Sequence, residues 1–364
     1  QSIGGAPWLQ LSPFAPSPVV FARQWPHTTH AYLEALRLIE EHHARAAILL
    51  SHAVGALDPQ ALPWLARCIL NEPVDLVMPY YLLEPHEGLL NSAILYPLSR
   101  AFYRTSVRFP LGGDLSFSAK FALALDLHPG AAALPEEDPI VWPVPQTQRM
   151  SFSVAEVPMQ RELPAQAETG DIAALFSRVV GSLFSDIELR ALEWQTTPKF
   201  LQARHIKGAI RSTTWGAAQA RSNASGSAPH PELTLMLESF RLAAKNLHEV
   251  WSQAMTPRTL FSVMRLAATP PDVKFSMSNS LWVRIVYDFL VAFRGRAVNR
   301  NHLVGALMPL YFAWTASHLL ALGSEVEPGP ERTAEERIEA LAQVFETDKP
   351  YLLARWRWPD NFNP

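Results

Sequence analysis

The sequence contains a single cysteine, Cys68, among its 364 residues, which excludes an internal disulfide and is typical of a reducing compartment. We therefore expect a cytoplasmic protein in which Cys68 is a buried small hydrophobe. An excess of one charge is also lacking, because the net charge is -3. No overall basic field favours nucleic acid as a partner, so binding to nucleic acid is not expected.

Long apolar runs are missing as well, and none reaches the length that a membrane span needs. Residues 1–18 lack the basic region and the continuous apolar stretch of a signal peptide, so we expect neither a leader nor a membrane anchor. What is present is a hydrophobic content of 48% and a charged content of 18%. This composition is typical of a globular protein with a sizeable core.

The first half of the chain alternates strand and helix patterns. Residues 46–50 and 74–80 are short apolar runs, and a helical pattern from Pro59 to about Leu70 separates them. This order predicts an α/β fold with a mostly parallel sheet. Alternation over residues 151–157 predicts a further strand, whereas the prolines between 140 and 145 argue against a helix there.

The second half has helical periods only. The apolar spacing predicts five helices between Pro231 and the end of the chain, at 233–255, 257–267, 280–294, 301–322 and 333–346. Small polar residues fill 216–230, a composition typical of linkers. We therefore predict an α/β domain over 1–215, a linker over 216–230 and a helical domain over 231–364.

A glycine pair followed by an acid is the first candidate for a binding site. Gly112 and Gly113 allow the backbone to come close to a ligand, and Asp114 is placed to grip hydroxyl groups. The same residues also fit an ordinary turn before the apolar segment that begins at Leu115. The motif is informative because of its neighbours rather than by itself.

These neighbours give the chain a resemblance to a known family. Pro79-Tyr80-Tyr81, Asn91-Ser92, Tyr96-Pro97-Leu98 and Pro110-Leu111-Gly112-Gly113-Asp114 occur in that order, and long matching segments follow at 281–289, 308–311 and 345–352. In these motifs the sequence resembles GT-A-type glycosyltransferases related to family 2, in particular bacterial enzymes similar to mannosylglycerate synthase and glucosyl-3-phosphoglycerate synthase. The resemblance implies a GT-A-like sheet followed by an all-α bundle.

By resemblance, the activity is transfer of a hexose from a nucleotide-sugar to a small hydroxy-acid-type acceptor. Asp114 and Asp138 take the catalytic positions, the first orienting hydroxyls and the second contacting acceptor or donor. Gly112 and Gly113 form the floor of the site, and Arg161 offsets phosphate charge. For Asp138 and Arg161 a plain alternative stays open, because each also fits a solvated surface residue.

The chain departs from the family at its metal site. Family members hold Mg²⁺ or Mn²⁺ with an Asp-x-Asp motif and a distant histidine. Ser51-His52-Ala53 stands at the Asp-x-Asp position, and no histidine follows Arg161 at the second position. Serine and alanine cannot hold a hard cation, and a lone His52 fits a polar residue at a strand end. We expect no metal cofactor, and a shortened nucleotide-binding half, because only fifty residues precede Ser51.

Two functions remain open at this stage. The first is an active hexosyltransferase that uses a nucleotide-sugar and a small acceptor. The second is a non-catalytic pseudo-glycosyltransferase that acts as a partner or scaffold subunit or as a carbohydrate-binding module, with a protein partner or a second copy of the chain. Trp282, Tyr287 and Tyr311 could touch a sugar, but we predict that they pack in the helical core.

Overall fold

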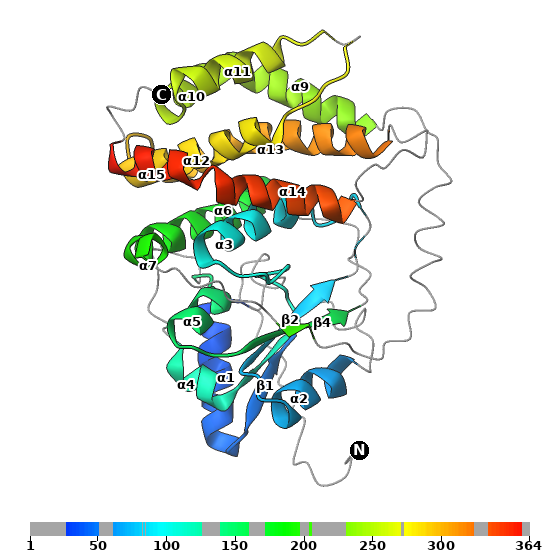
Figure 1. The fold of residues 1–364 in the computed structure, drawn as a ribbon, viewed down its shortest axis with the longest axis vertical. Helices are drawn as coiled ribbons and strands as arrows, with labels where there is room; N and C mark the ends of the chain where they lie inside the picture. Colours follow the sequence, from blue (N-terminus) through cyan, green and yellow to red (C-terminus); the bar gives the residue numbers. More distant parts are fainter. Residues whose placement is uncertain are drawn as a thin grey trace.

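The structure is a computed structural model (Figure 1). It describes the residues in the following ranges: 27–50, 61–81, 83, 85–125, 139–159, 172–196, 204–205, 231–270, 273–323 and 334–358. Within them a small sheet with its own helices lies below a larger stack of helices in the view of Figure 1. This arrangement confirms the coarse prediction of an α/β part followed by a helical part.

The sheet has five strands in the order β1-β3-β2-β4-β5. Their bounds are Ala46–Leu49, Leu115–Ser118, Leu76–Tyr81, Val154–Met159 and Arg204–His205 in that spatial order. Strand β3 is antiparallel to both β1 and β2, whereas β4 is parallel to β2 and to β5. The sheet is therefore mixed.

Four of the five strands run in one direction, as a mostly parallel sheet requires, and the path of the chain after β2 explains why β3 is the exception. Helices η3 (Asn91–Leu95, a π-helix) and α3 (Tyr96–Tyr103) continue into the helical part, where α3 packs against α14 (Ala334–Thr347). They do not return along a face of the sheet, as the helix of a parallel crossover does. The chain re-enters the sheet from its carboxyl edge, so β3 runs in the opposite direction to its neighbours.

Both faces of the sheet are covered by helices. Helices α1 (Thr29–His42), α4 (Ala119–Ala124) and α5 (Pro143–Arg149) share one apolar cluster with inward side chains of β2, β3 and β4. Helix α2 (Ala61–Asn71) covers the other face. Cys68 lies in that second cluster with 3% of its surface exposed, as predicted.

Helix α5 corrects the prediction that the prolines after residue 139 prevent a helix. Pro143 and Pro145 both lie in the first turn of α5. Amide groups in a first turn have no partner within the helix, so a missing N–H there costs nothing, and the fixed proline φ suits the helix.

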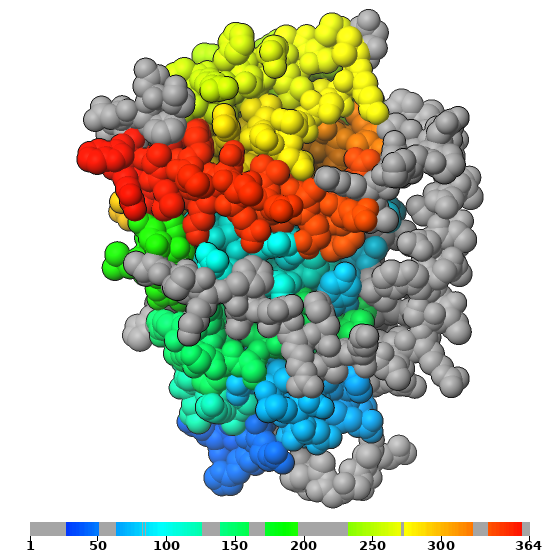
Figure 2. All heavy atoms as spheres, viewed as in Figure 1, coloured from blue at the N-terminus to red at the C-terminus, as the bar shows by residue number. Residues whose placement is uncertain are grey.

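The helical part contains the largest apolar cluster of the described residues. Its helices are α6 (Ile172–Leu189), α7 (Ala191–Thr196), α9 (Pro231–Asn246), α10 (His248–Ala254), α11 (Pro257–Ala267), α12 (Asn279–Gly295), α13 (Arg300–Gly323), α14 and α15 (Lys349–Arg357). The cluster joins these helices to η3 and α3. Figure 2 shows α14 lying directly over residues of α3 on the visible face. Helices from before and after residues 216–230 thus share one core.

One helix of the described chain, Arg300–Leu322 within α13, is long and apolar enough to cross a membrane by length and composition. The prediction that no apolar run is long enough to span a membrane is corrected for this helix. However, 61% of its most apolar window is buried inside the protein, where α13 packs against α6, α9 and α12. This burial favours a core helix over a membrane span.

Candidate functional site

The candidate site is the Gly-Gly-Asp turn at the carboxyl edge of the sheet. Asp114 directly precedes β3, which runs antiparallel to β2, so it lies where the parallel strand β2 ends at Tyr81. The motif Pro79-Tyr80-Tyr81 therefore meets the glycine pair in space, although about thirty residues separate them in the sequence. In sheets with parallel strands, ligands bind beyond this edge.

Asp114 is directed into the protein rather than into solvent. Only 1% of its surface is exposed. The hydroxyl of Tyr81 donates a hydrogen bond to the Asp114 carboxylate over 3.0 Å, and the backbone N–H of Asp114 donates to the same hydroxyl oxygen over 3.2 Å. A carboxylate bound in this way is satisfied by the protein itself, so in this conformation Asp114 fixes the turn.

A buried histidine fixes the other side of the turn. The Nε2 atom of His27 lies 2.6 Å from the carbonyl oxygen of Gly112, and its Nδ1 atom lies 3.0 Å from the hydroxyl of Tyr32. Because a carbonyl only accepts, Nε2 carries the proton and Nδ1 accepts from Tyr32. Complete burial lowers the pKa of His27 to about 4, which keeps the ring neutral at pH 7.

Gly112 occupies a position that no larger residue fits. A Cβ atom on this glycine would lie 2.2 Å from Cγ and 2.7 Å from Cδ of Pro79, and 3.2 Å from the carbonyl oxygen of Phe109. The proline ring cannot rotate away as a flexible side chain can. Gly112 therefore allows close packing between the turn and β2, whereas Gly113 is partly exposed.

Replacing Gly112 with alanine is expected to lower the free energy of unfolding by about 1–3 kcal/mol, because the turn must move away from Pro79. Gly305→Ala in helix α13 is the matched control, since no atom lies within 4 Å of the added Cβ. Alanine is the better helix former, so the control should gain up to about 1 kcal/mol. Urea unfolding of both variants measures the difference, and equal changes would contradict the packing role of Gly112.

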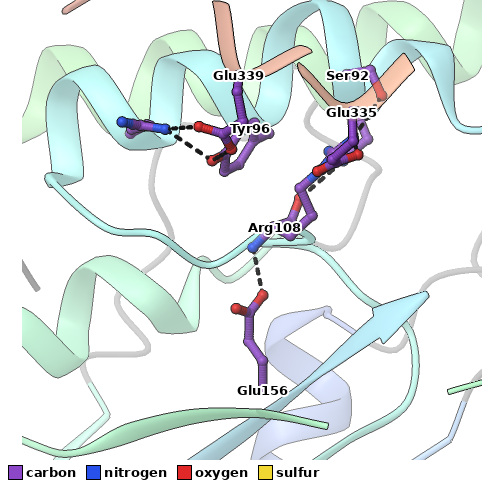
Figure 3. A network of polar contacts seen from close by, with 8 residues as sticks. Ser92, Tyr96, Arg108, Glu156, Glu335 and Glu339 are labelled. Carbon is purple, nitrogen blue, oxygen red and sulfur yellow. Dashed lines mark hydrogen bonds and ion pairs between the residues drawn. The ribbon is translucent and has the colours of Figure 1, made fainter. Parts of the chain in front are cut away.

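A polar network joins this edge of the sheet to the helices (Figure 3). The guanidinium of Arg108 donates to Glu335 on α14 over 2.8 Å and to the Ser92 hydroxyl over 3.2 Å, and it lies 4.8 Å from the centre of the Tyr96 ring. Ser92 and Tyr96 belong to η3 and α3. Arg108 is 5% exposed, so it is an interior contact between the two parts of the protein.

Glu156 of β4 connects this network to the sheet (Figure 3). Its carboxylate accepts the backbone N–H of Arg108 over 2.5 Å, and none of its surface is exposed. Burial raises its pKa from 4.5 to about 7, against the lowering effect of the Arg108 hydrogen bond and charge. Sequence reasoning missed Glu156, although a charged residue in phase with Val154 in a strand pattern was a usable signal.

A second polar cluster lies farther along α3, at its contact with α14. Arg100 forms ion pairs with Glu339 and Glu346 of α14, and the Tyr96 hydroxyl hydrogen-bonds to Glu339. Burial together with the Glu339 carboxylate raises the pKa of Tyr96 above its ordinary value. Contacts of Arg100, Arg108 and Tyr96 with glutamates of α14 thus hold the α14 helix against α3 and the segment that follows it.

The remaining residues predicted for the site lie outside the described residues. They are Ser51, His52, Ala53, Asp138 and Arg161. Their roles stay predictions, as does the absence of a metal cofactor. Within the ranges that the structure describes, no group of three or more His, Cys, Asp or Glu residues is arranged to hold a metal ion.

Three aromatic residues of the helical part were predicted to pack rather than to contact a sugar. Trp282 and Tyr287 have none of their surface exposed, and Tyr311 has 7%. The indole N–H of Trp282 donates to the carbonyl of Ala93 over 3.0 Å, and the hydroxyl of Tyr287 donates to the carbonyl of Phe345. The packing prediction is confirmed for all three.

No protein-family model matches this chain, and no curated protein matches it in sequence. The glycosyltransferase relationship therefore depends on the motifs quoted above.

Proposed function

We propose that the chain is a glycosyltransferase-like protein that acts as a non-catalytic partner or scaffold subunit. In this proposal the fold is related to that of GT-A enzymes, and the Gly-Gly-Asp turn has a structural role. Fold and function separate readily in evolution, so a sugar-transfer scaffold can persist after the chemistry is lost.

The state of Asp114 is the observation that carries the proposal. In the family that the motifs resemble, this turn forms the floor of the sugar and acceptor site. Here the Asp114 carboxylate is bound by the Tyr81 hydroxyl and buried, and the Gly112 carbonyl is bound by neutral His27. A residue that must orient substrate hydroxyls needs a carboxylate that the substrate can reach.

The chemistry of the sequence supports the same conclusion. Ser51 and Ala53 offer no carboxylate at the position where the family holds its cation, and no histidine follows Arg161. Two separate departures, distant in the sequence, both remove ligands for the same ion. Without that ion the leaving diphosphate of a nucleotide-sugar would need another source of positive charge.

Active hexose transfer is the competing function, and the place of Asp114 at the carboxyl edge of the sheet favours it. In that account the Asp114 carboxylate leaves Tyr81 when a sugar binds and orients its hydroxyl groups. Asp138 and Arg161 would then contact the acceptor and the phosphates.

Calorimetry of the purified chain with UDP- and GDP-hexoses, with and without Mn²⁺ or Mg²⁺, distinguishes the two functions. We expect no metal-linked binding of any nucleotide-sugar. Tight binding that requires the cation, or transfer of hexose to a hydroxy acid, would contradict the proposal. The double variant Ser51→Asp with Ala53→Asp tests whether Ser51-His52-Ala53 stands at the Asp-x-Asp position of the family. A gain of Mn²⁺ affinity is expected only if it does.

A further inference from the structure

Helices α9, α10 and α11 form the outermost layer of the helical part, at the opposite end of the molecule from α1 (Figure 1). Eleven large apolar side chains are exposed among the described residues, and four of them lie in this layer or just after it. These four expose between 51% and 68% of their surfaces, and they are Leu235, Leu242, Phe261 and Val273. A gathering of exposed apolar side chains on a folded protein marks an interaction surface.

Helix α11 places an aromatic ring between two cations. Arg258, Phe261 and Arg265 are all exposed, and their spacing of three and four residues puts them on one side of the helix. Thr259 and Val263 are buried on the other side. No acidic residue occurs in α11, so its two arginines give the exposed side a charge of +2. The whole chain, in contrast, has a net charge of -3.

The outer side of α9 continues this surface. Leu235 and Leu242 are two turns apart, and the exposed Lys245 follows on the same side. The guanidinium of Arg241 donates to the carbonyl oxygen of Thr269 over 3.1 Å, which holds α9 against the end of α11. The acids of the layer lie on α9 and α10, and they are Glu232, Glu238 and Glu249. We name the α9–α11 surface by six residues, Leu235, Leu242, Lys245, Arg258, Phe261 and Arg265.

We propose that the α9–α11 surface docks on a membrane that contains anionic lipids. Arg258 and Arg265 pair with lipid headgroups, and Phe261 inserts between them with the leucines of α9 beside it. Apolar insertion together with charge attraction holds amphipathic helices at membrane interfaces. An acidic protein would need a pocket for each projecting side chain, whereas a lipid interface receives them wherever they project. The inference uses none of the residues at the sheet edge, so it does not depend on the function proposed above.

Co-sedimentation of the full chain with vesicles tests the proposal. The probes are vesicles of phosphatidylcholine alone and vesicles of phosphatidylcholine mixed with phosphatidylserine. We expect the chain to bind the phosphatidylserine vesicles at least about tenfold more tightly, because each cation near an anionic surface adds to the attraction. Raising the ionic strength from about 0.1 M to about 1 M shortens the screening length from about 10 Å to about 3 Å and should release the chain.

Variants at exposed positions provide the controls. Arg258→Gln with Arg265→Gln and, separately, Phe261→Ser should each weaken vesicle binding at least about tenfold. Leu33→Ser with Arg37→Gln is the matched control, because both side chains are exposed on α1, and it should leave binding unchanged.

The proposal is overturned if the phosphatidylserine vesicles do not bind, if phosphatidylcholine alone binds equally well, or if the α1 control weakens binding as much as the α11 variants do. Binding of polyglutamate or duplex DNA without binding of vesicles would also overturn it, in favour of an acidic protein or a nucleic acid as the partner.

Discussion

Replacing Asp288 with alanine is expected to lower the free energy of unfolding by about 3–5 kcal/mol. Asp288 lies in the middle of α12 and has none of its surface exposed. Its carboxylate accepts the backbone N–H of Thr256 over 3.0 Å and the hydroxyl of Tyr351 over 2.6 Å, and it pairs with the buried guanidinium of Arg355. Thr256 caps α11, and Tyr351 and Arg355 both lie on α15, so the carboxylate on α12 connects two other helices of the helical part.

The expected cost is large because the variant leaves charge without a partner. Arg355 is 8% exposed, and after the substitution its guanidinium stays buried with no carboxylate beside it. The double variant Asp288→Ala with Arg355→Met removes that charge too, so it should be more stable than Asp288→Ala alone. The order of these two stabilities separates the effect of an unpaired charge from that of a lost side chain.

Urea unfolding followed by tryptophan fluorescence measures both variants. Glu34→Ala is the control, because Glu34 pairs with Arg37 on the exposed surface of α1, and no measurable change is expected there. An Asp288→Ala protein as stable as the Glu34→Ala control would contradict the account of a buried, charge-balanced cluster.

The second large effect concerns pH. Glu156→Gln is expected to remove a pH-dependent contribution to stability of up to about 3 kcal/mol, since the folded pKa of Glu156 is about 7 and its ordinary value is 4.5. Between these two values the folded state holds a proton that the unfolded state has released. The contribution of Glu156 to stability is therefore present in full below pH 4.5 and is lost as the pH rises through 7.

His27 acts in the opposite direction over an overlapping range. Its pKa falls from 6.5 in the unfolded state to about 4 in the folded state, so its contribution is present above pH 6.5 and is lost as the pH falls through 4. The two effects partly cancel in the pH profile of the wild type. The difference between the Glu156→Gln variant and the wild type isolates Glu156, because His27 is present in both.

Unfolding free energies at pH 4 and pH 8 give this difference. Relative to the wild type, the Glu156→Gln variant should be more stable at pH 8 than at pH 4, by up to about 3 kcal/mol. Glutamine keeps an oxygen that can accept the Arg108 N–H, so the hydrogen bond itself is preserved. A difference that stays constant across this pH range would show that Glu156 titrates at its ordinary value.

Much of the fold could be predicted from local patterns. The helical periods after Pro231 correspond to α9 through α14, except that the single helix predicted at 233–255 is divided into α9 and α10. Thr256 before Pro257 caps α11, as such a pair usually does. The direction of β3 could not be predicted in this way. It depends on where α3 packs, and that contact with α14 joins residues more than 200 positions apart in the sequence.

The site was predicted in part. The glycine pair was recognised as a position of close approach, and the structure places the ring of Pro79 against Gly112. The partners Tyr81 and His27 could not be assigned, because nothing in the local sequence around Asp114 specifies which distant side chain meets it. Burial, which decides the pKa of His27 and of Glu156, is likewise a property of the assembled fold.

The central claim is that Asp114 serves the structure of the turn, and a double-mutant cycle between Tyr81 and Asp114 tests it most directly. Tyr81→Phe, Asp114→Ala and the double variant are unfolded in urea, and the coupling energy follows from the three changes in stability. A buried hydrogen bond to a carboxylate predicts a coupling of about 1–3 kcal/mol. A coupling near zero, with Asp114→Ala as stable as the wild type, would contradict the claim and return Asp114 to the role of a substrate-binding residue.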